Sequence, residues 1–277
     1  MSKIFARSFR VRFSELDATG CVSPASHLRY LVETAYDWGD ALGLGARDSQ
    51  RMGIFWLIRE TQFHLLHPLR HNDRFDFTIW MVNWQRVRGT RCFELTQSDG
   101  QVAARGSQHI VCMDSATLRP TSPPQAVIEN FRIENPRVFL IERFPKIERQ
   151  PGSFTFQRQV EWGDLDPLEH INNANYVTLA EEAATRQRAD RGWSPAKLAE
   201  SNLIVATRSI HIQYLSPAVW GETLTISTHP HSTHATGGTC YVRMSRPDGS
   251  LVCECLLGWA LLDRATEQPH PLPEGFC

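Results

Sequence analysis

The sequence predicts an α+β fold that is built twice, and three observations lead to it. The 277 residues are enough for two domains of ordinary size. The sequence also matches itself at a constant shift of 149 positions, the difference between Asp17 and Asp166. Each copy reads as an amphipathic helix followed by four β-rich segments, an order typical of a helix packed on a mostly antiparallel sheet.

The shift relates features of different kinds, so it does not arise only from common turn residues. We interpret the pattern as a tandem duplication, with a first module at 1–116, a connector at 117–152 and a second module at 153–277. The equivalent features are Leu16 and Leu165, Glu33 and Glu182, Arg59 and Arg208, Leu66-x-Pro68 and Leu215-x-Pro217, Gly89-Thr90 and Gly238-Thr239, Asp99-Gly100 and Asp248-Gly249, and Asp114 and Asp263.

The elements are expected at matching places in the two copies. A short strand (8–14 and 154–162) precedes an acidic turn, and a helix (25–42 and 173–190) follows it. The connector begins TLRPTSPPQ, and its prolines oppose regular structure. Four strand-like segments complete each copy, at 54–66, 74–84, 90–98 and 101–113 in the first and at 203–215, 223–231, 239–247 and 250–262 in the second.

The composition is that of a soluble globular protein, with 42% hydrophobic and 21% charged residues. A formal charge of −1 gives no electrostatic case for nucleic acid or an anionic membrane as a partner. The N-terminus lacks the apolar core of a signal peptide, and no run approaches the roughly 18 apolar residues of a membrane span. Seven cysteines without CxxC spacing favour a reduced, cytoplasmic protein.

The stretch EWGDLDPLEHINNANYVTLAEEA, at 161–183, gathers acidic, histidine and asparagine side chains before the second-copy helix. Two interpretations compete, a well-capped strand-to-helix turn and an active site. Asp166 could attack a carbonyl directly or take a proton from water, and both routes stay open. Asp164 and Asp166 alternate along an extended chain, so only one of them should face inward. His170 could orient the carboxylate or the water, or protonate a leaving group.

Asn172 and Asn173 are natural N-cap residues, and capping is the favoured role for both. Either side-chain amide could instead contact a carbonyl at the helix start. A backbone N–H at this point is the expected donor to an oxyanion, because unpaired amides and the positive end of the helix dipole converge there.

Two stretches resemble a known family. VRFSELDATGCVSPASHLRYLVETA, at 11–35, resembles the opening of single-domain hotdog acyl-CoA thioesterases of the 4-hydroxybenzoyl-CoA type. The stretch at 161–183 resembles the second half of acyl-acyl-carrier-protein thioesterases, which carry two hotdog modules in one chain. The most specific part is Asp164-Leu-Asp166-x-x-x-His170-Ile-Asn172-Asn173-x-x-Tyr176.

The resemblance implies tandem hotdog modules, a double hotdog in which each long helix is wrapped by a curved antiparallel sheet. It also implies hydrolysis that uses a carboxylate, with no metal, no cofactor and no serine nucleophile. The family's catalytic aspartate falls on Asp166 and its histidine on His170.

The sequence departs from the family pattern at three positions. Leu168 stands where the carrier-protein enzymes have an asparagine, and Pro217 stands where they have a later glutamate. Pro24 replaces a histidine that many single-domain relatives carry after the aspartate equivalent to Asp17. We therefore expect the better-equipped site in the second copy, and we treat Asp17 as a second or degenerate site.

We predict a thioesterase that releases a fatty or related acid from acyl carrier protein, the favoured carrier, or from coenzyme A. The alternatives are an acyl-CoA thioesterase for a non-fatty acyl group and an acyl-thioester-binding protein whose site has decayed. A hydratase on the same scaffold would need an Asp/His pattern that the sequence lacks. Two modules in one chain already form an internal pseudo-dimer, so a further homodimer is not required.

Overall fold

The computed structural model describes residues 3–139, 142–148, 150 and 152–276. The chain divides between Glu142 and Arg143 into two units, so the predicted connector is shared between them. Residues 140–141, 149 and 151 of that connector lie outside the described residues. The module boundaries predicted at 116 and 153 follow the sequence repeat, and they stay predictions.

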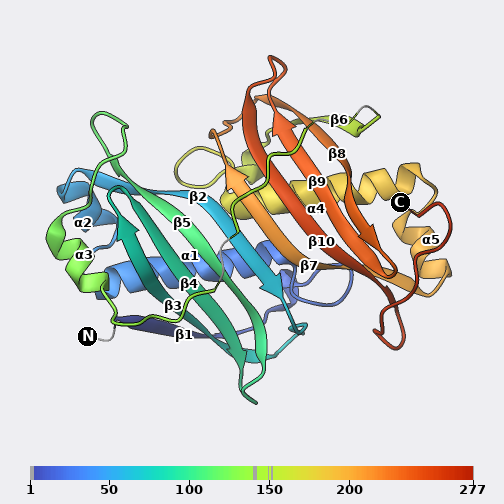
Figure 1. Cartoon of the computed structure of the whole chain (residues 1–277), viewed down its shortest axis with the longest axis horizontal. Helices are drawn as coiled ribbons and strands as arrows, with labels where there is room; N and C mark the ends of the chain where they lie inside the picture. Colours follow the sequence, from blue (N-terminus) through green and yellow to red (C-terminus); the bar gives the residue numbers. More distant parts are fainter. Residues whose placement is uncertain (1–2, 140–141, 149, 151, 277) are drawn as a thin grey trace. The chain divides into compact units, whose positions relative to one another are not determined.

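The first unit is an antiparallel sheet with a long helix, α1, against one face (Figure 1). Its strands lie in the order β1-β3-β4-β5-β2. The elements are β1 Ile4–Arg10, the 3₁₀ turn η1 Phe13–Glu15, α1 Pro24–Ala41, α2 Ala46–Arg51, β2 Ile54–Leu65, β3 Arg74–Gln85, β4 Arg88–Gln97, β5 Val102–Asp114 and α3 Gln125–Phe131.

The second unit has the same construction, with helix α4 against one face of a sheet ordered β7-β10-β9-β8-β6 (Figure 1). The elements are β6 Phe154–Gln159, η2 Trp162–Asp164, α4 Asn173–Asp190, α5 Pro195–Glu200, β7 Leu203–Tyr214, β8 Thr223–His234, β9 Gly237–Ser245 and β10 Leu251–Asp263.

The predicted duplication extends to the element boundaries. Helices α1 and α4 begin at residues 24 and 173 and have 18 residues each, so the shift of 149 positions relates them end to end. The same shift relates β2 to β7 and α2 to α5. Each unit is one long helix wrapped by a curved antiparallel sheet, which confirms the α+β class and the tandem hotdog modules.

Local sequence explains where each long helix begins. In the first unit the Ser23 hydroxyl accepts a hydrogen bond from the Ser26 N–H (3.1 Å), and Pro24 occupies the first helical position. In the second unit the Asn172 side chain accepts from the Ala174 N–H (2.9 Å). The predicted helices are thus confirmed to within one residue at each end.

The expected strand at 8–14 is wrong in its bounds, because β1 ends at Arg10 and η1 follows. The Arg12 N–H donates to the Glu15 carboxylate (2.6 Å), which closes the chain into a turn. In the second unit the Glu161 N–H donates to Asp164 in the same way (2.7 Å), so the strand predicted to 162 ends at Gln159. The short helices α2, α3 and α5 were not expected, and α3 forms within the proline-rich connector.

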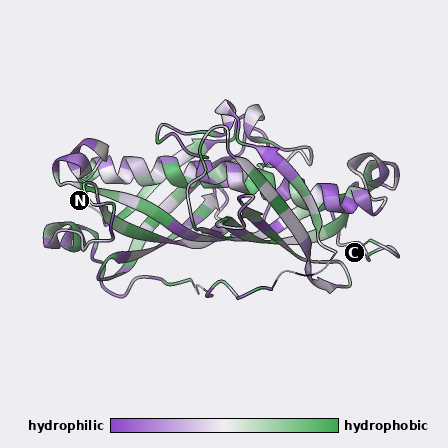
Figure 2. Cartoon of the chain, turned by 90° about the horizontal axis from the view of Figure 1, so that it is seen from above, coloured by the Kyte–Doolittle hydropathy of each residue, from purple (hydrophilic) through white to green (hydrophobic). Residues whose placement is uncertain are grey.

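Aromatic rings fill the space between α1 and its sheet. Phe63, Phe77 and Phe93 are fully buried, and the Phe93 ring centroid lies 4.8 Å from that of Phe63 and 5.6 Å from that of Phe77. Helix α4 instead presents small residues such as Ala180 and Ala183, both 0% exposed. Figure 2 shows hydrophobic stretches along the strands and hydrophilic residues along the helices. This pattern is typical of amphipathic elements around a core.

His27 lies inside the first unit, and burial lowers its pKa from 6.5 to about 4. Its Nδ1–H donates to the Ser23 carbonyl (2.9 Å). Between pH 6.5 and about 4 the unfolded chain therefore binds a proton at His27 that the folded chain excludes. We expect the free energy of unfolding to fall by about 3 kcal/mol from this group as the pH drops from 7 to about 4. Denaturant unfolding of wild type and His27→Gln across this window tests the prediction, and parallel pH profiles would contradict it.

No helix among the described residues is long and apolar enough to cross a membrane. The cysteines that the structure describes carry free thiols.

Candidate active site

Asp166 lies in a tight turn between η2 and α4. A β-bridge between Leu165 and Ile171 closes the turn, and the Asp166 N–H donates to the His170 carbonyl (3.0 Å). One carboxylate oxygen of Asp166 accepts a hydrogen bond from the Leu168 N–H (2.9 Å). The side chain is 18% exposed, so the carboxylate is fixed at one oxygen and still reachable by a small reactant.

The turn requires left-handed backbone at Glu169, whose φ is +62°. The first copy has Gly20 at this position, with φ +78°. The left-handed conformation is sterically unfavourable for residues that carry a Cβ atom. We expect Glu169→Gly to stabilise the fold by roughly 0.5–1 kcal/mol, measured by denaturant unfolding. The control is Glu161→Gly, at a position where the backbone is extended (φ −97°), and this substitution should not stabilise the fold. Equal changes in stability from the two substitutions would contradict the steric explanation.

His170 lies beside this carboxylate. Its Nδ1 is 3.7 Å from Asp166 Oδ1 and 3.3 Å from the Ile171 carbonyl oxygen. The distance to the carboxylate is longer than a hydrogen bond but suits an ion pair when the imidazole is protonated. Catalytic hydrogen bonds are often long without substrate. The structure thus brings together the two side chains that the sequence predicted.

Asp164 has a different role from Asp166. Its carboxylate accepts two hydrogen bonds from Arg158 (2.8 and 2.9 Å) and one from the Glu161 N–H (2.7 Å). Its carbonyl accepts from the Asn172 N–H (2.9 Å). Asp164 therefore stabilises the turn through its hydrogen bonds, and the Asp166 carboxylate is the one that remains available to react with a substrate.

Of the two asparagines, Asn172 has a structural role and Asn173 is left available for contact with a substrate. Asn172 caps α4 through Ala174, which is the structural role favoured by the sequence. Asn173 is the first residue of the helix, and neither its backbone N–H nor its side chain has a hydrogen-bond partner among the residues described. An unpaired N–H in the first turn, at the positive end of the helix dipole, is suited to receive an oxyanion.

The first copy repeats the turn with its aspartate but lacks the imidazole and the free N–H that follow the aspartate in the second copy. Asp17 accepts from the Thr19 N–H (2.7 Å), as Asp166 accepts from Leu168, and it also accepts from the Thr19 hydroxyl. At the position of His170 it has Cys21. At the position of Asn173 it has Pro24, which carries no N–H. The first copy thus keeps the carboxylate and lacks both groups that accompany it in the second.

Among the residues that the structure describes, no three His, Cys, Asp or Glu side chains are grouped so as to hold a metal ion. The Asp166 carboxylate has the His170 imidazole beside it and accepts from the Leu168 N–H, and helix α4 begins at Asn173, seven residues further along the chain. Such a set can activate water and stabilise a negatively charged oxygen at a carbonyl.

Fold and site together define a hotdog protein with a carboxylate at the entrance of its second long helix. The chain belongs to the thioesterase-like superfamily, whose model matches it twice, over residues 11–131 and 160–277. These two ranges follow the duplication, and they contain both aspartate turns.

Individual relatives are more distant. A palmitoyl-acyl carrier protein thioesterase of Cuphea hookeriana is 22% identical over 187 residues, which cover 63% of this chain and 45% of that protein. The long-chain acyl-CoA thioesterase FadM of Escherichia coli is 27% identical over 113 residues, 40% of this chain and 85% of that protein. The chain therefore matches less than half the length of the first relative.

Solved structures share the whole fold. The 12:0-ACP thioesterase from Umbellularia californica superposes with a TM-score of 0.78, at 19% identity, over 94% of each chain. An acyl-ACP thioesterase from Bacteroides thetaiotaomicron gives 0.77, at 16% identity, over 94% of this chain and all of the other. Both similarities confirm the double hotdog.

Proposed function

We propose that this chain hydrolyses an acyl thioester, of acyl carrier protein or coenzyme A, to a free fatty or related acid. The observation that carries the proposal is that His170 lies beside Asp166 in the turn that leads into α4, whose first residue, Asn173, has an unpaired N–H. This arrangement lies on a scaffold of the thioesterase-like superfamily.

In the proposed reaction the thioester carbonyl lies against the Asn173 N–H. Asp166 takes a proton from water, whose oxygen bonds to the carbonyl carbon, or it attacks that carbon itself and water then releases the acid. The developing oxyanion is stabilised by the amide and by the dipole of α4. As the oxyanion re-forms the carbonyl, the carbon–sulfur bond breaks and the sulfur leaves as a thiolate, a good leaving group that needs little help from an acid. On the route of direct attack the acyl group is then bonded to the Asp166 carboxylate, and water hydrolyses that bond in the last step.

His170 assists by orienting the carboxylate or the water. Its Nδ1 lies 3.7 Å from Asp166 Oδ1, close enough to hold the carboxylate or a water beside it in place. Asn172, as the helix cap, contributes by fixing the first turn in which the Asn173 N–H lies.

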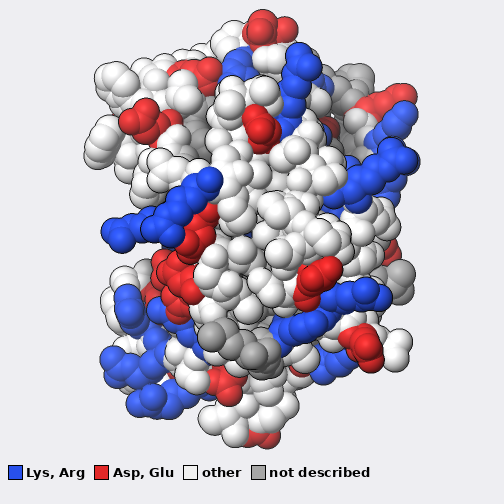
Figure 3. Space-filling model, turned by 90° about the vertical axis from the view of Figure 1, so that its left-hand side faces the viewer, with Lys and Arg blue, Asp and Glu red and all other residues white. Residues whose placement is uncertain are grey.

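Both carriers remain in the proposal. The layout of two modules in one chain favours acyl carrier protein, whereas the first copy resembles the CoA-specific enzymes. The relatives above are named for palmitoyl-acyl carrier protein and for long-chain acyl-CoA. Figure 3 shows positive and negative side chains interspersed on the face it presents, so charge on that face does not discriminate an acidic carrier protein from CoA. The cytoplasmic location and a further homodimer also stay predictions.

Product analysis tests the proposal. The wild-type chain is incubated with acyl-CoA and acyl-carrier-protein thioesters that differ in chain length, and the acid and free thiol are quantified by mass spectrometry. We expect the two products in equal amounts, with the preferred carrier giving the higher kcat/KM. Thioester recovered intact but bound to the protein would support the decayed binding protein instead.

A further inference from the structure

The loop between β7 and β8, residues 215–222, supports the candidate site through its backbone. The Ile171 N–H donates to the Ala218 carbonyl (2.9 Å), and His170 forms an antiparallel β-bridge with Val219. The Ala218 N–H in turn donates to the hydroxyl of buried Tyr176, on the first turns of α4 (3.2 Å). The position of the His170 backbone therefore depends on the position of this loop.

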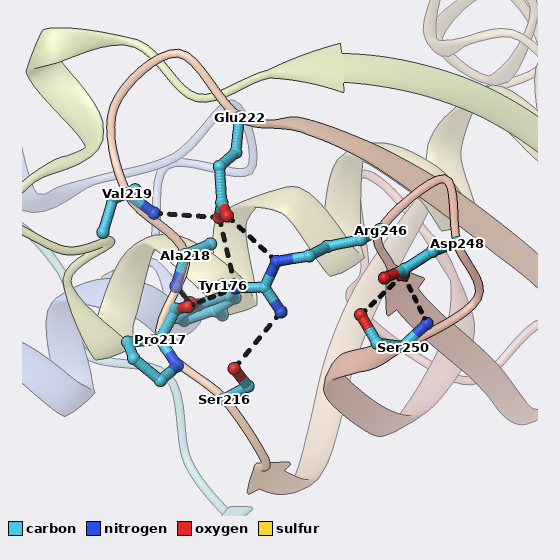
Figure 4. A network of polar contacts seen from close by, with 9 residues as sticks. All are labelled: Tyr176, Ser216, Pro217, Ala218, Val219, Glu222, Arg246, Asp248 and Ser250. Carbon is cyan, nitrogen blue, oxygen red and sulfur yellow. Dashed lines mark hydrogen bonds and ion pairs between the residues drawn. The ribbon is translucent and has the colours of Figure 1, made fainter.

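A single guanidinium holds both ends of the loop (Figure 4). Arg246 donates to the Pro217 carbonyl (2.6 Å) and to the Ser216 hydroxyl (3.2 Å) at one end. At the other end it donates to both carboxylate oxygens of Glu222 (2.9 and 3.2 Å), which also accepts from the Val219 N–H (3.1 Å). The fork geometry of arginine is suited to this pairing.

We call Arg246 and its partners Ser216, Pro217 and Glu222 the arginine clamp. Its two charged side chains are only partly exposed, and Arg246 lies in an ordered turn. The side chains of Arg246 and Glu222 are 23% and 29% exposed. Hydrogen bonds from Arg246 lower the pKa of Glu222, so the carboxylate is ionised at neutral pH. Arg246 begins the β9–β10 turn, where Asp248 accepts from the Ser250 N–H (2.9 Å) and hydroxyl (2.7 Å). The backbone that carries Arg246 is thus part of an ordered turn, in which the Arg246 N–H donates to the Ser250 carbonyl (2.9 Å).

The first copy shows that the backbone pairing forms without the clamp. There the Val22 N–H donates to the Leu69 carbonyl (2.8 Å), and Cys21 forms the matching bridge with Arg70. The position of Arg246 is Gln97 in that copy, and a glutamine carries no charge. The arginine clamp therefore occurs in the copy that contains His170, and the equivalent turn folds without it.

We propose that Arg246 is a positioning residue for the second-copy site. By tying Ser216, Pro217 and Glu222 together, it fixes the loop that holds the His170 backbone and so keeps the imidazole beside Asp166. The inference rests on the proposed thioester hydrolysis. It adds a residue for which the family resemblance gives no role.

The test replaces Arg246 with the residue of the first copy. Arg246→Gln should lower kcat by about tenfold to a hundredfold, with KM changed by less than about threefold, because small misplacements affect the transition state most. Arg246→Lys should recover part of the loss. Glu222→Gln should lower kcat similarly, and the double substitution should add little to either single one. Arg264→Gln removes one charge from an exposed position of the same unit and should leave kcat unchanged.

Hydrogen exchange gives a readout that does not require turnover. In Arg246→Gln the Ile171 amide should exchange about tenfold faster or more, whereas the equivalent Val22 amide should be unchanged. Unchanged exchange at Ile171, or a wild-type kcat in Arg246→Gln, would overturn the positioning role. Faster exchange at Ile171 in a chain whose wild type hydrolyses no thioester would support the positioning role and reject the proposed function.

Discussion

Asp166→Asn is expected to lower kcat for thioester hydrolysis by about a hundredfold or more, with little change in KM. The asparagine oxygen can still accept the Leu168 N–H, so the turn keeps its geometry. The amide can neither take a proton from water nor attack a carbonyl, so the chemistry is lost while the fold remains. Steady-state kinetics by thiol release, together with thermal unfolding of both proteins, measures the effect.

Asp17→Asn is the matched control, because the same side chain is altered in an equivalent turn. The first copy lacks the imidazole and the N–H, so this variant should keep activity within about twofold of wild type. A large loss in Asp17→Asn with activity retained in Asp166→Asn would place the active site in the first copy.

Asn173→Pro is expected to lower kcat by about a hundredfold, because it deletes the proposed oxyanion donor. Proline is well tolerated at the first position of a helix. The preceding residue, Asn172, has φ −58° and ψ 137°, which is compatible with a following proline. The first copy already has this arrangement at Ser23-Pro24, where ψ of Ser23 is 148°. The substitution therefore removes one N–H with little change in the fold.

Asn173→Ala separates the backbone from the side chain, since alanine keeps the N–H and loses the amide group. We expect activity close to wild type for this variant. Equal losses in Asn173→Ala and Asn173→Pro would assign the contact to the side-chain amide, and wild-type rates in Asn173→Pro would exclude this N–H as the donor. Circular dichroism of both variants confirms that α4 is intact.

The sequence predicted the architecture well because each helix or strand pattern occurs twice, once in each copy, and the two occurrences support each other. The helix at 173–190 and the strand beginning at 203 were each supported by an equivalent segment 149 residues earlier. The first strand was placed wrongly because alternating residues at 8–14 resemble a strand, whereas the side chain of Glu15 closes a local turn. The six-residue helices α2 and α5 are too short to show periodicity.

The candidate site was only partly predictable. Asp166, His170 and the asparagines lie within eight positions, so a local pattern shows them together. The separation of Asp164 from Asp166 depends on Arg158, which precedes the turn and carries no motif. Arg246 lies 76 positions beyond His170 in sequence and was missed. Comparison of the two copies would have shown it, because its equivalent is the uncharged Gln97.

The catalytic role of Asp166 is tested most directly by measuring the release of free thiol from one panel of acyl-CoA and acyl-carrier-protein thioesters by wild type and Asp166→Asn side by side. We expect sustained turnover of at least one thioester by wild type and about one per cent of that rate or less in the variant. Turnover by Asp166→Asn at the wild-type rate would contradict the proposed active site. Absence of turnover by wild type on the whole panel would contradict the proposed function itself.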